Sequence, residues 1–314
     1  MGCQPQKKYT HLEGQAQGTT FRIVYASEQD FSGAVDSLFR MLDHSMSLWD
    51  STSIISQVNK NTLETPVDIH FETVFRKSQE ISSLTDGAFD ITVGPLVKAW
   101  GFSYKKGLPL PTSQQIDSIK KVVGYRMVQL HESRLVKTNS QTAIDFNAIA
   151  QGYTVDVMAH FLKSHAINDF LVEIGGEVRT EGRNEKGQIW QIGIDKPTEN
   201  QAEARALQTV VSLSGKSLAT SGSYRKFVVR EGKKFSHAID PKTGFPITHN
   251  LLSISVIADD CMTADAYATA FLVLGLEKAK TIAAQQGLEL YAISATSKGE
   301  WQLFHTPKFF SKAE

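Results

Sequence analysis

The sequence predicts an α+β fold in which helices pack against mostly antiparallel or mixed sheets. Short segments that alternate apolar and polar residues come in pairs joined by turn residues, which is typical of β-hairpins. Helical patterns are interspersed among these pairs and do not follow each strand in turn, so a doubly wound parallel sheet is not expected. The composition is that of an ordinary globular protein, since 41% of the 314 residues are hydrophobic and 21% are charged.

The first third of the chain starts with a strand and continues with helices. Residues 18–26 alternate and are rich in β-branched and aromatic side chains, which favours a strand. Apolar side chains recur at helical spacing from residue 35 to residue 42. A second helix is expected over residues 71–84. Residues 104–121 are polar and contain proline, so they are expected to form a loop that leads into a helix.

From residue 122 onward hairpins and helices mix. The expected elements are a hairpin within 127–138, a strand, a turn and a helix within 142–165, two strands within 169–182 joined by a turn at Gly175–Gly176, a strand within 188–197, two strands within 209–222, a hairpin within 226–246 turned at Glu231–Gly232, a strand at 251–258, a helix from about residue 263, and closing strands at 288–294 and 301–306. Residues 1–16 are expected to form an N-terminal tether, 17–305 a single folded domain, and 306–314 a C-terminal tail.

Charge and composition exclude several classes of function. The chain carries 33 basic and 33 acidic residues, so it offers no broad basic surface for nucleic acid or for an anionic membrane. No run approaches the roughly 18 apolar residues of a membrane span. The two cysteines are too few and too far apart for a zinc site or a disulfide framework. Cys261 is expected to be a small buried residue beside the start of a helix.

Cys3 follows Gly2 at the head of a short polar segment. A mature bacterial lipoprotein begins at such a cysteine, and a lipid there would anchor the protein to a membrane. An incidental cysteine fits the same residues, because no hydrophobic signal region is present to decide between the two. The myristoylation pattern fails, since Gln6 occupies the position that requires Ser or Thr.

Several common catalytic and nucleotide-binding motifs are absent from the sequence. Gly215-Lys216-Ser217 would need a glycine at position 210 to form a P-loop, and Val210 is there. The glycines at 175 and 176 lack dinucleotide-binding spacing and lie between two strands, which favours a hairpin turn. Neither a G-x-S-x-G elbow nor an H-E-x-x-H motif is present.

Asp265 and Thr269 stand four residues apart on a predicted helix and therefore share a face. Two hard oxygens at this spacing suit Mg²⁺ better than zinc. The alanines between and around them are expected to leave room for a ligand. A second interpretation stays open, in which Asp265 only lies in the first helical turn, where the helix dipole favours a negative charge.

Two further segments place polar groups at the ends of strands. Asp145 precedes a predicted helix, so it caps that helix or leaves backbone carbonyls near Ala148 turned outward. His237 lies just before a type I turn at residues 240–243, where an imidazole can serve as a general base near neutral pH. A histidine at a strand end is also commonly a surface or packing residue.

Taken together, the polar segments resemble, in order, the motifs of the ApbE family, the FAD:protein FMN transferases. The resemblance runs from about residue 17 to residue 305. The segments that carry it are Gly87–Phe102 ("GAFDITVGPLVKAWGF"), Asp145–Asp156 ("DFNAIAQGYTVD"), Ile174–Glu177 ("IGGE"), Ala219–Arg225 ("ATSGSYR"), Ser236–Pro246 ("SHAIDPKTGFP") and Ala264–Gly275 ("ADAYATAFLVLG").

The resemblance implies a two-lobed α+β catalytic domain with FAD between the lobes and Mg²⁺ on the FAD pyrophosphate. It implies transfer of FMN to a Ser or Thr hydroxyl of a target protein, with AMP as the leaving group. Matched by position, Asp265, Thr269 and the backbone oxygens of Ala148 and Ala268 are the expected metal ligands. The expected FAD contacts are Gln17, Trp49, Ala88, Phe89, Asp90, Asp145, Gln151 and Ile239, with Trp49 beside the flavin.

His237 is the residue we expect to act as the base that accepts the proton of the acceptor hydroxyl. Arg225 or Lys226 either helps to neutralise phosphate charge or lies on a solvated face. The chain departs from the family pattern at Gln17, Asn147 and Ser223. None of these departures removes an expected metal ligand, whereas Gln17 and Asn147 affect the flavin contacts and the turn after Asp145.

The resemblance also implies partners and a location. The expected partners are FAD and flavin-accepting subunits of membrane redox complexes of the Na⁺-pumping NADH:quinone reductase or Rnf type. If Cys3 carries a lipid, the expected location is the periplasmic side of the bacterial inner membrane. Two alternatives to the transferase share its motifs: a Mg²⁺-dependent FAD pyrophosphatase that releases FMN and AMP, and a flavin-binding protein without turnover.

Overall fold

A computed structural model describes residues 7–102, 109–197, 206–223, 227–230 and 233–311. Cys3, Arg225, Lys226 and the expected turn at Glu231–Gly232 lie outside these residues. The helices are α1 (Ser32–Met46), α2 (Ile54–Lys60), α3 (Ile69–Leu84), α4 (Gly94–Ala99), α5 (Ser113–Lys120), α6 (Ala150–Ser164), α7 (Cys261–Leu274) and α8 (Leu276–Gln286), with a 3-10 turn at Tyr125–Met127.

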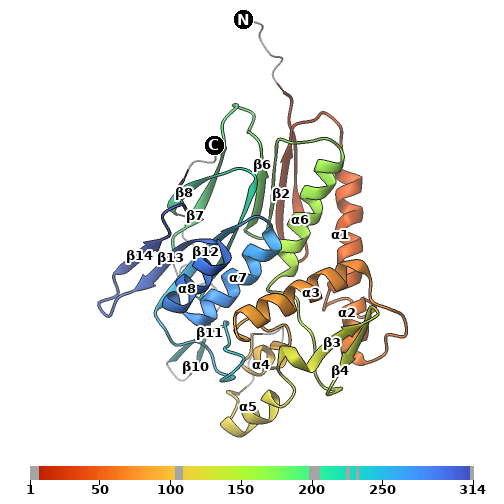
Figure 1. Ribbon diagram of the computed structural model, residues 1–314, viewed down its shortest axis with the longest axis vertical. Helices are drawn as coiled ribbons and strands as arrows, with labels where there is room; N and C mark the ends of the chain where they lie inside the picture. The colour runs from red at the N-terminus through yellow and green to blue at the C-terminus, as the bar shows by residue number, and fades with distance from the viewer. Residues whose placement is uncertain (1–6, 103–108, 198–205, 224–226, 231–232, 312–314) are drawn as a thin grey trace, which may run out of the picture.

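One large sheet organises the molecule (Figure 1). Each neighbouring pair in it is antiparallel. Its eight strands, in spatial order, are β1 (Thr10–Ala16), β2 (Thr19–Tyr25), β5 (Phe170–Ile174), β6 (Glu177–Glu181), β9 (Lys216–Gly222), β12 (Leu251–Ala258), β13 (Glu289–Ala295) and β14 (Trp301–His305). The α+β prediction with antiparallel sheets is therefore confirmed.

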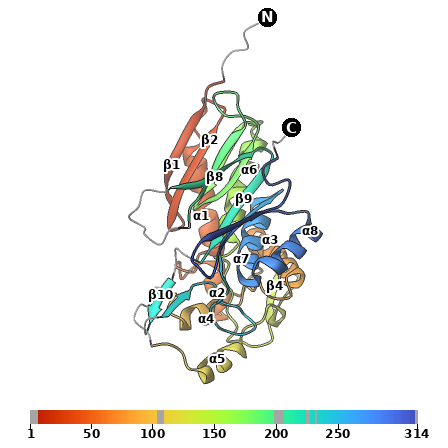
Figure 2. The same cartoon turned by 90° about the vertical axis from the view of Figure 1, so that its left-hand side faces the viewer.

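The part of the chain that the structure describes also contains three two-stranded hairpins: β3 (Val128–His131) with β4 (Arg134–Lys137), β7 (Trp190–Asp195) with β8 (Leu207–Leu213), and β10 (Phe227–Arg230) with β11 (Lys233–Ser236). The β7–β8 hairpin covers one face of the large sheet through an apolar cluster that includes Trp190, Ile192 and Val211 (Figure 2). Helices α1, α6 and α7 cover the opposite face. The sheet is thus buried on both faces over much of its area.

Side-chain caps fix where several helices begin. Asp68 accepts a hydrogen bond from the Phe71 N–H at the start of α3, and Asp260 accepts one from the Thr263 N–H at the start of α7, each at 2.8 Å. Thr112 and Gln115 form a capping box on α5. Such bonds satisfy N–H groups that have no partner within a helix. The Asp260 cap therefore fixes where α7 begins, and α7 carries two of the predicted metal ligands.

The predicted tether is wrong for residues 10–16, which form the edge strand β1. Leu12 and Ala16 alternate with polar residues and pack against the sheet. Gln17 and Gly18 both have positive φ, 53° and 74°, and they join β1 to β2 as a two-residue turn that suits a hairpin. The described chain starts before β1 at Lys7, which pairs with Asp169.

The predicted strand within 142–146 is also wrong. Ile144 is held instead by the Asn59 side chain, which donates to the Ile144 carbonyl at 2.8 Å and accepts from its N–H at 2.7 Å. The Asp145 N–H donates to the Ile91 carbonyl at 2.7 Å. Since a side-chain amide and a loop carbonyl supply these bonds, the segment needs no strand partner.

Part of the predicted C-terminal tail, at Thr306 and Phe309, likewise packs against the folded domain. The Thr306 N–H donates to the Leu290 carbonyl at 3.0 Å. Phe309 is 1% exposed and its ring lies 5.5 Å from that of Tyr291. The chain after β14 therefore folds back to close the apolar cluster beneath β7 and β8. Among the described residues, no helix is long and apolar enough to cross a membrane.

We expect Phe309→Ala to destabilise the protein by about 3–5 kcal/mol, because a buried aromatic side chain would leave a cavity. The matched control is Phe310→Ala, since the neighbouring ring is 37% exposed and its loss is expected to cost about 1 kcal/mol. Urea unfolding of the two variants measures both values. Equal stability of the two variants would contradict the burial of the C-terminal segment.

Candidate active site

The structure brings the motif segments together from distant parts of the sequence. The Trp100 indole N–H donates to the Gly244 carbonyl at 2.8 Å, which joins segment 87–102 to segment 236–246. Leu96 of α4 also packs in one apolar cluster with Ile239. Helix α4, α5 and the β10–β11 hairpin lie together at the end of the molecule that is away from the N-terminus (Figures 1 and 2).

His237 follows β11 and is half-buried beside this cluster. Its ring lies 6.3 Å from that of Phe102 with an interplanar angle of 69°. The Ser236 hydroxyl accepts a hydrogen bond from the Ala238 N–H at 3.2 Å. A turn follows as predicted, but it is one residue wider than a type I turn at 240–243, since the Gly244 N–H donates to the Asp240 carbonyl and Gly244 has a positive φ of 79°. The backbone on both sides of His237 is therefore held by defined bonds.

Asp145 also contacts segment 87–102, at Gly94. A Cβ atom added to Gly94 would lie 3.3 Å from the Asp145 Cβ atom, so the two backbones are in close contact. The Asp145 carboxylate accepts the Asn147 N–H at 2.8 Å, whereas no side chain caps α6. Asp145 therefore orders the turn before α6 and does not cap the helix. Burial raises the pKa of its carboxyl group.

Asp90 and its neighbours form a rigid turn. The Asp90 carboxylate accepts hydrogen bonds from the N–H and hydroxyl of Thr92, at 2.7 and 2.6 Å, and from the Tyr125 N–H at 2.8 Å. Burial raises its pKa, and these donors oppose the shift. Ala88 and Phe89 are buried in the same turn. The side chain of Asp90 therefore serves the protein itself, and a contact with FAD there would involve the backbone.

Asp265 lies where α6 and α7 touch. A Cβ atom on Gly152 would lie 2.4 Å from the Cys261 carbonyl and 2.8 Å from the Asp265 Cβ atom, so only glycine permits this approach. The Gly152 N–H donates to the Asp265 carboxylate at 3.1 Å. Asp265 is 7% exposed, and burial raises its pKa to about 7. Asp265 is not in the first turn of α7, so the helix dipole does not account for it.

Thr269 lies one turn beyond Asp265 on α7 and is half-buried. Its hydroxyl lies 3.1 Å from the Ser221 hydroxyl of β9. The alanines at positions 264, 266, 268 and 270 were expected to leave room for a ligand. They do not, because all four are fully buried and pack in the main core. Ala148 lies in the turn before α6, within the same segment as Gly152.

The remaining predicted flavin contacts are spread along α6 and the β1–β2 turn. The Gln151 side chain lies against the Gly175–Gly176 turn, where a Cβ atom on Gly175 would be 2.9 Å from its Nε2. Gln17 accepts from the Thr154 hydroxyl at 3.1 Å and donates to Asp43 at 3.3 Å. Trp49 follows α1 and is 74% exposed. A large apolar ring this exposed is available to a partner or ligand.

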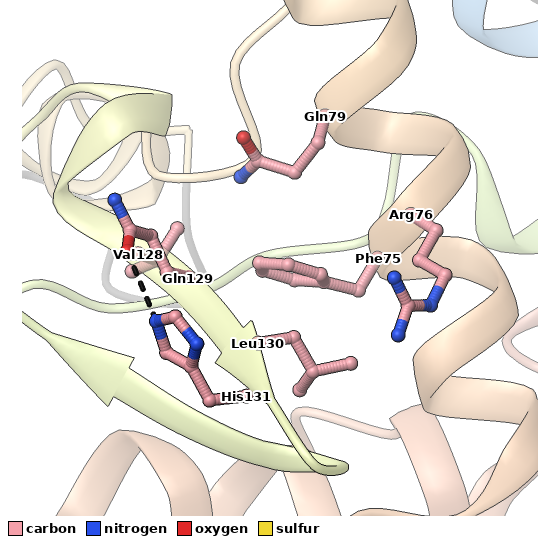
Figure 3. A pocket seen from close by; sticks show the side chains of 7 residues that line it. All are labelled: Phe75, Arg76, Gln79, Val128, Gln129, Leu130 and His131. Carbon is pink, nitrogen blue, oxygen red and sulfur yellow. Dashed lines mark hydrogen bonds between the residues drawn. The ribbon is translucent and has the colours of Figure 1, made fainter.

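None of the predicted site residues lines the cavity between α3 and β3 shown in Figure 3. This cavity is about 410 Å³ and is lined by Phe75, Arg76, Gln79, Val128, Gln129, Leu130 and His131. His131 bonds to Gln129 at 3.1 Å, and Gln79 donates to the Tyr125 carbonyl. These polar side chains therefore bond to other groups of the protein. The motif segments lie outside this cavity.

Known proteins resemble this chain in sequence and in fold. The ApbE family model matches residues 17–292. This chain belongs to the ApbE family. A FAD:protein FMN transferase of Haemophilus influenzae is 36% identical over 312 residues, which cover 95% of this chain and 90% of the relative. One of Escherichia coli is 34% identical over 332 residues, which cover 99% and 93%.

Solved structures of ApbE proteins have the same fold. The flavin transferase ApbE from Vibrio cholerae matches with a TM-score of 0.86 and 33% identity, covering 96% of this chain and 98% of that one. The apo form of the Pseudomonas stutzeri flavinyl transferase ApbE matches with a TM-score of 0.86 and 30% identity, covering 98% and 99%. The resemblance inferred from the motifs is therefore confirmed at the level of family and fold.

Two residues of this ApbE chain that the sequence did not single out lie beside the predicted ligands. Ser221 contacts Thr269, as described. Asp156 of α6 accepts the Cys261 and Met262 N–H groups, at 2.9 and 2.8 Å, and pairs with Arg179 at 2.6 Å. Gly152 and Asp156 are four residues apart, so one face of α6 holds the first turn of α7. The sequence shows this spacing, but it does not show that this face of α6 packs against α7.

We expect Gly152→Ala to destabilise the fold by about 2–3 kcal/mol, because its methyl group would push α7 away from α6. Gly33→Ala is the matched control, since a Cβ atom there meets nothing within 4 Å, and it is expected to be neutral or stabilising by up to about 1 kcal/mol. Thermal and urea unfolding measure the difference. A stable Gly152→Ala variant would contradict the close contact between the helices.

Proposed function

We propose that this chain transfers FMN from FAD to a Ser or Thr hydroxyl of a target redox protein, in a Mg²⁺-dependent reaction that releases AMP. It is a transferase of the ApbE family, and its relatives in Haemophilus influenzae and Escherichia coli are named FAD:protein FMN transferases. The observation that carries the proposal is the buried Asp265 carboxylate, which lies within the shared segments and has a pKa raised to about 7. Burial of an unpaired carboxylate charge costs free energy, and a nearby cation would offset that cost.

The proposed metal ligands are Asp265, Thr269 and the backbone oxygens of Ala148 and Ala268. Within the described part of the chain, no group of three or more His, Cys, Asp or Glu side chains could hold a metal ion. The proposed set has a single carboxylate and does not require such a group, because Mg²⁺ commonly takes one or two carboxylates with water and substrate phosphates. The all-oxygen donors fit this ion.

A magnesium ion bound there would neutralise charge on the pyrophosphate. In the proposed reaction the bond between the bridging oxygen and the flavin-side phosphorus breaks, and that phosphorus bonds to the acceptor oxygen. AMP leaves with the electron pair, and the hydroxyl proton passes to His237 as the base. Asp145, Gln151 and the turn at Ala88–Asp90 would hold FAD, and Trp49 would contact the flavin.

The partners and the location are also proposals. Flavin-accepting subunits of membrane redox complexes, of the Na⁺-pumping NADH:quinone reductase or Rnf type, present the hydroxyl that the reaction needs. A lipid on Cys3 would hold the enzyme on the periplasmic side of the inner membrane, near such subunits. Mass spectrometry of the natively produced protein would reveal the lipid.

The reaction is tested by incubating the protein with FAD, Mg²⁺ and a candidate acceptor. We expect one AMP released for each FMN attached, measured by chromatography and by in-gel flavin fluorescence. Asp265→Asn removes the charge and is expected to lower the rate at least about 100-fold, since a metal contributes several kcal/mol to the barrier. Asp260→Asn is the control, because this residue caps the same helix.

Three outcomes would contradict the proposal. Free FMN released as fast without acceptor as with it would make the protein a pyrophosphatase. FAD that stays intact with Mg²⁺ and acceptor present would make it a flavin-binding protein. Equal activity of the Asp265→Asn and Asp260→Asn variants would show that the reaction does not depend on the proposed metal ligand Asp265.

His237→Ala is expected to keep FAD affinity within about threefold and to lower the rate of transfer about 10²- to 10⁴-fold, the usual contribution of a general base. His131→Ala is the control, since this histidine lies on β3 and bonds to Gln129. Single-turnover kinetics and a fluorescence titration of FAD separate the two effects. A wild-type rate, or a loss confined to FAD affinity, would assign His237 a different role.

A further inference from the structure

Two neighbouring hydroxyls on β9 have different environments. Ser221 Oγ lies 3.1 Å from Thr269 Oγ1, and either atom can donate this hydrogen bond. Thr220 Oγ1 lies 2.7 Å from Ser255 Oγ of β12. The two residues are adjacent in one strand, so their side chains point to opposite faces of the sheet. Each hydroxyl thus belongs to a separate pair.

Strand register decides which pair faces the proposed metal site. Ser221 stands opposite Ile254 on β12, and Thr220 stands opposite Ser255. Ile254 belongs to the core cluster that contains Ala268 and Phe271 of α7. Directly opposed residues of an antiparallel pair share a face. Ser221 is therefore on the face covered by α7, and Thr220 is on the other.

We propose that Ser221 is a positioning residue for the metal site, because it accepts the Thr269 hydroxyl proton and so turns the lone pairs of Thr269 toward the cation. A hydroxyl has one proton and two lone pairs, and it binds a cation only through a lone pair. A bound cation makes Thr269 the better donor and disfavours a proton pointing at it. The ambiguous Ser221–Thr269 hydrogen bond then has one direction.

Both partners are fixed by rigid elements. Ser221 lies in β9 of the large sheet, where it pairs with Ile254 of β12. Thr269 lies in α7, whose first turn is held by Asp156 and capped by Asp260. Hydrogen bonds to the ligand of a metal commonly set its orientation, and their loss weakens metal binding about 10- to 100-fold. The inference rests on the proposed function for the cation and for Thr269 as one of its ligands.

The test compares Ser221→Ala with Thr220→Val, which removes the neighbouring hydroxyl on the opposite face. Mg²⁺ binding is measured by calorimetry in the presence of FAD, and transfer is measured as a function of Mg²⁺ concentration. We expect Ser221→Ala to raise the half-saturating Mg²⁺ concentration about 10- to 100-fold, and to keep the rate at saturation within about threefold. Thr220→Val should leave the Mg²⁺ dependence unchanged. Ser221→Thr should restore it, because the hydroxyl is retained.

Two results would overturn the inference. One is an unchanged Mg²⁺ affinity in Ser221→Ala while the wild-type protein transfers FMN, which leaves the proposed function standing. The other is an equal loss in Thr220→Val, which would show a general effect on the strand. If the wild-type protein releases FMN to water and Ser221→Ala still loses Mg²⁺ affinity, the inference holds and the transferase proposal fails.

Discussion

The contact between α6 and α7 at Gly152 is the constraint on which the rest of the site depends. It places the N–H of Gly152 on the Asp265 carboxylate, four residues after Ala148 in the same segment. No larger side chain fits there, because the Cys261 carbonyl occupies the space a Cβ atom would need. Asp156 completes the contact by accepting the first N–H groups of α7. A backbone approach and an accepting carboxylate together bring two segments that are distant in sequence into contact.

Much of the fold could be predicted from the sequence because its elements are local. The hairpin at Gly175–Gly176 forms as expected, since both glycines adopt positive φ and the flanking strands alternate. The edge strand β1 was missed because its turn uses Gln17, a residue without a strong turn preference. The C-terminal segment was missed because the burial of Phe309 depends on β7 and β8, more than 90 residues away in sequence. Local patterns do not contain such contacts.

The candidate site follows from the order of the motifs, whereas the contacts among its residues could not be predicted. The sequence placed Asp145 as a cap, and the structure uses its carboxylate to order a turn. The alanines beside Asp265 were expected to leave room for a ligand and instead fill the core. Ser221 and Thr220 are equivalent in sequence, and only the register with β12 distinguishes them. Side-chain roles of this kind follow from pairing between elements, which spacing within one element does not determine.

Hydrogen bonding distinguishes four aspartates by their roles. Asp90 and Asp156 each accept three bonds from protein donors. In the described residues, Asp265 accepts one, from Gly152, and Asp145 accepts one backbone bond, from Asn147. A carboxylate has about four acceptor sites, and burial raises the pKa of all four groups. The first pair is therefore satisfied by the fold. Asp265 retains acceptor capacity, so a cation or a ligand donor would stabilise it.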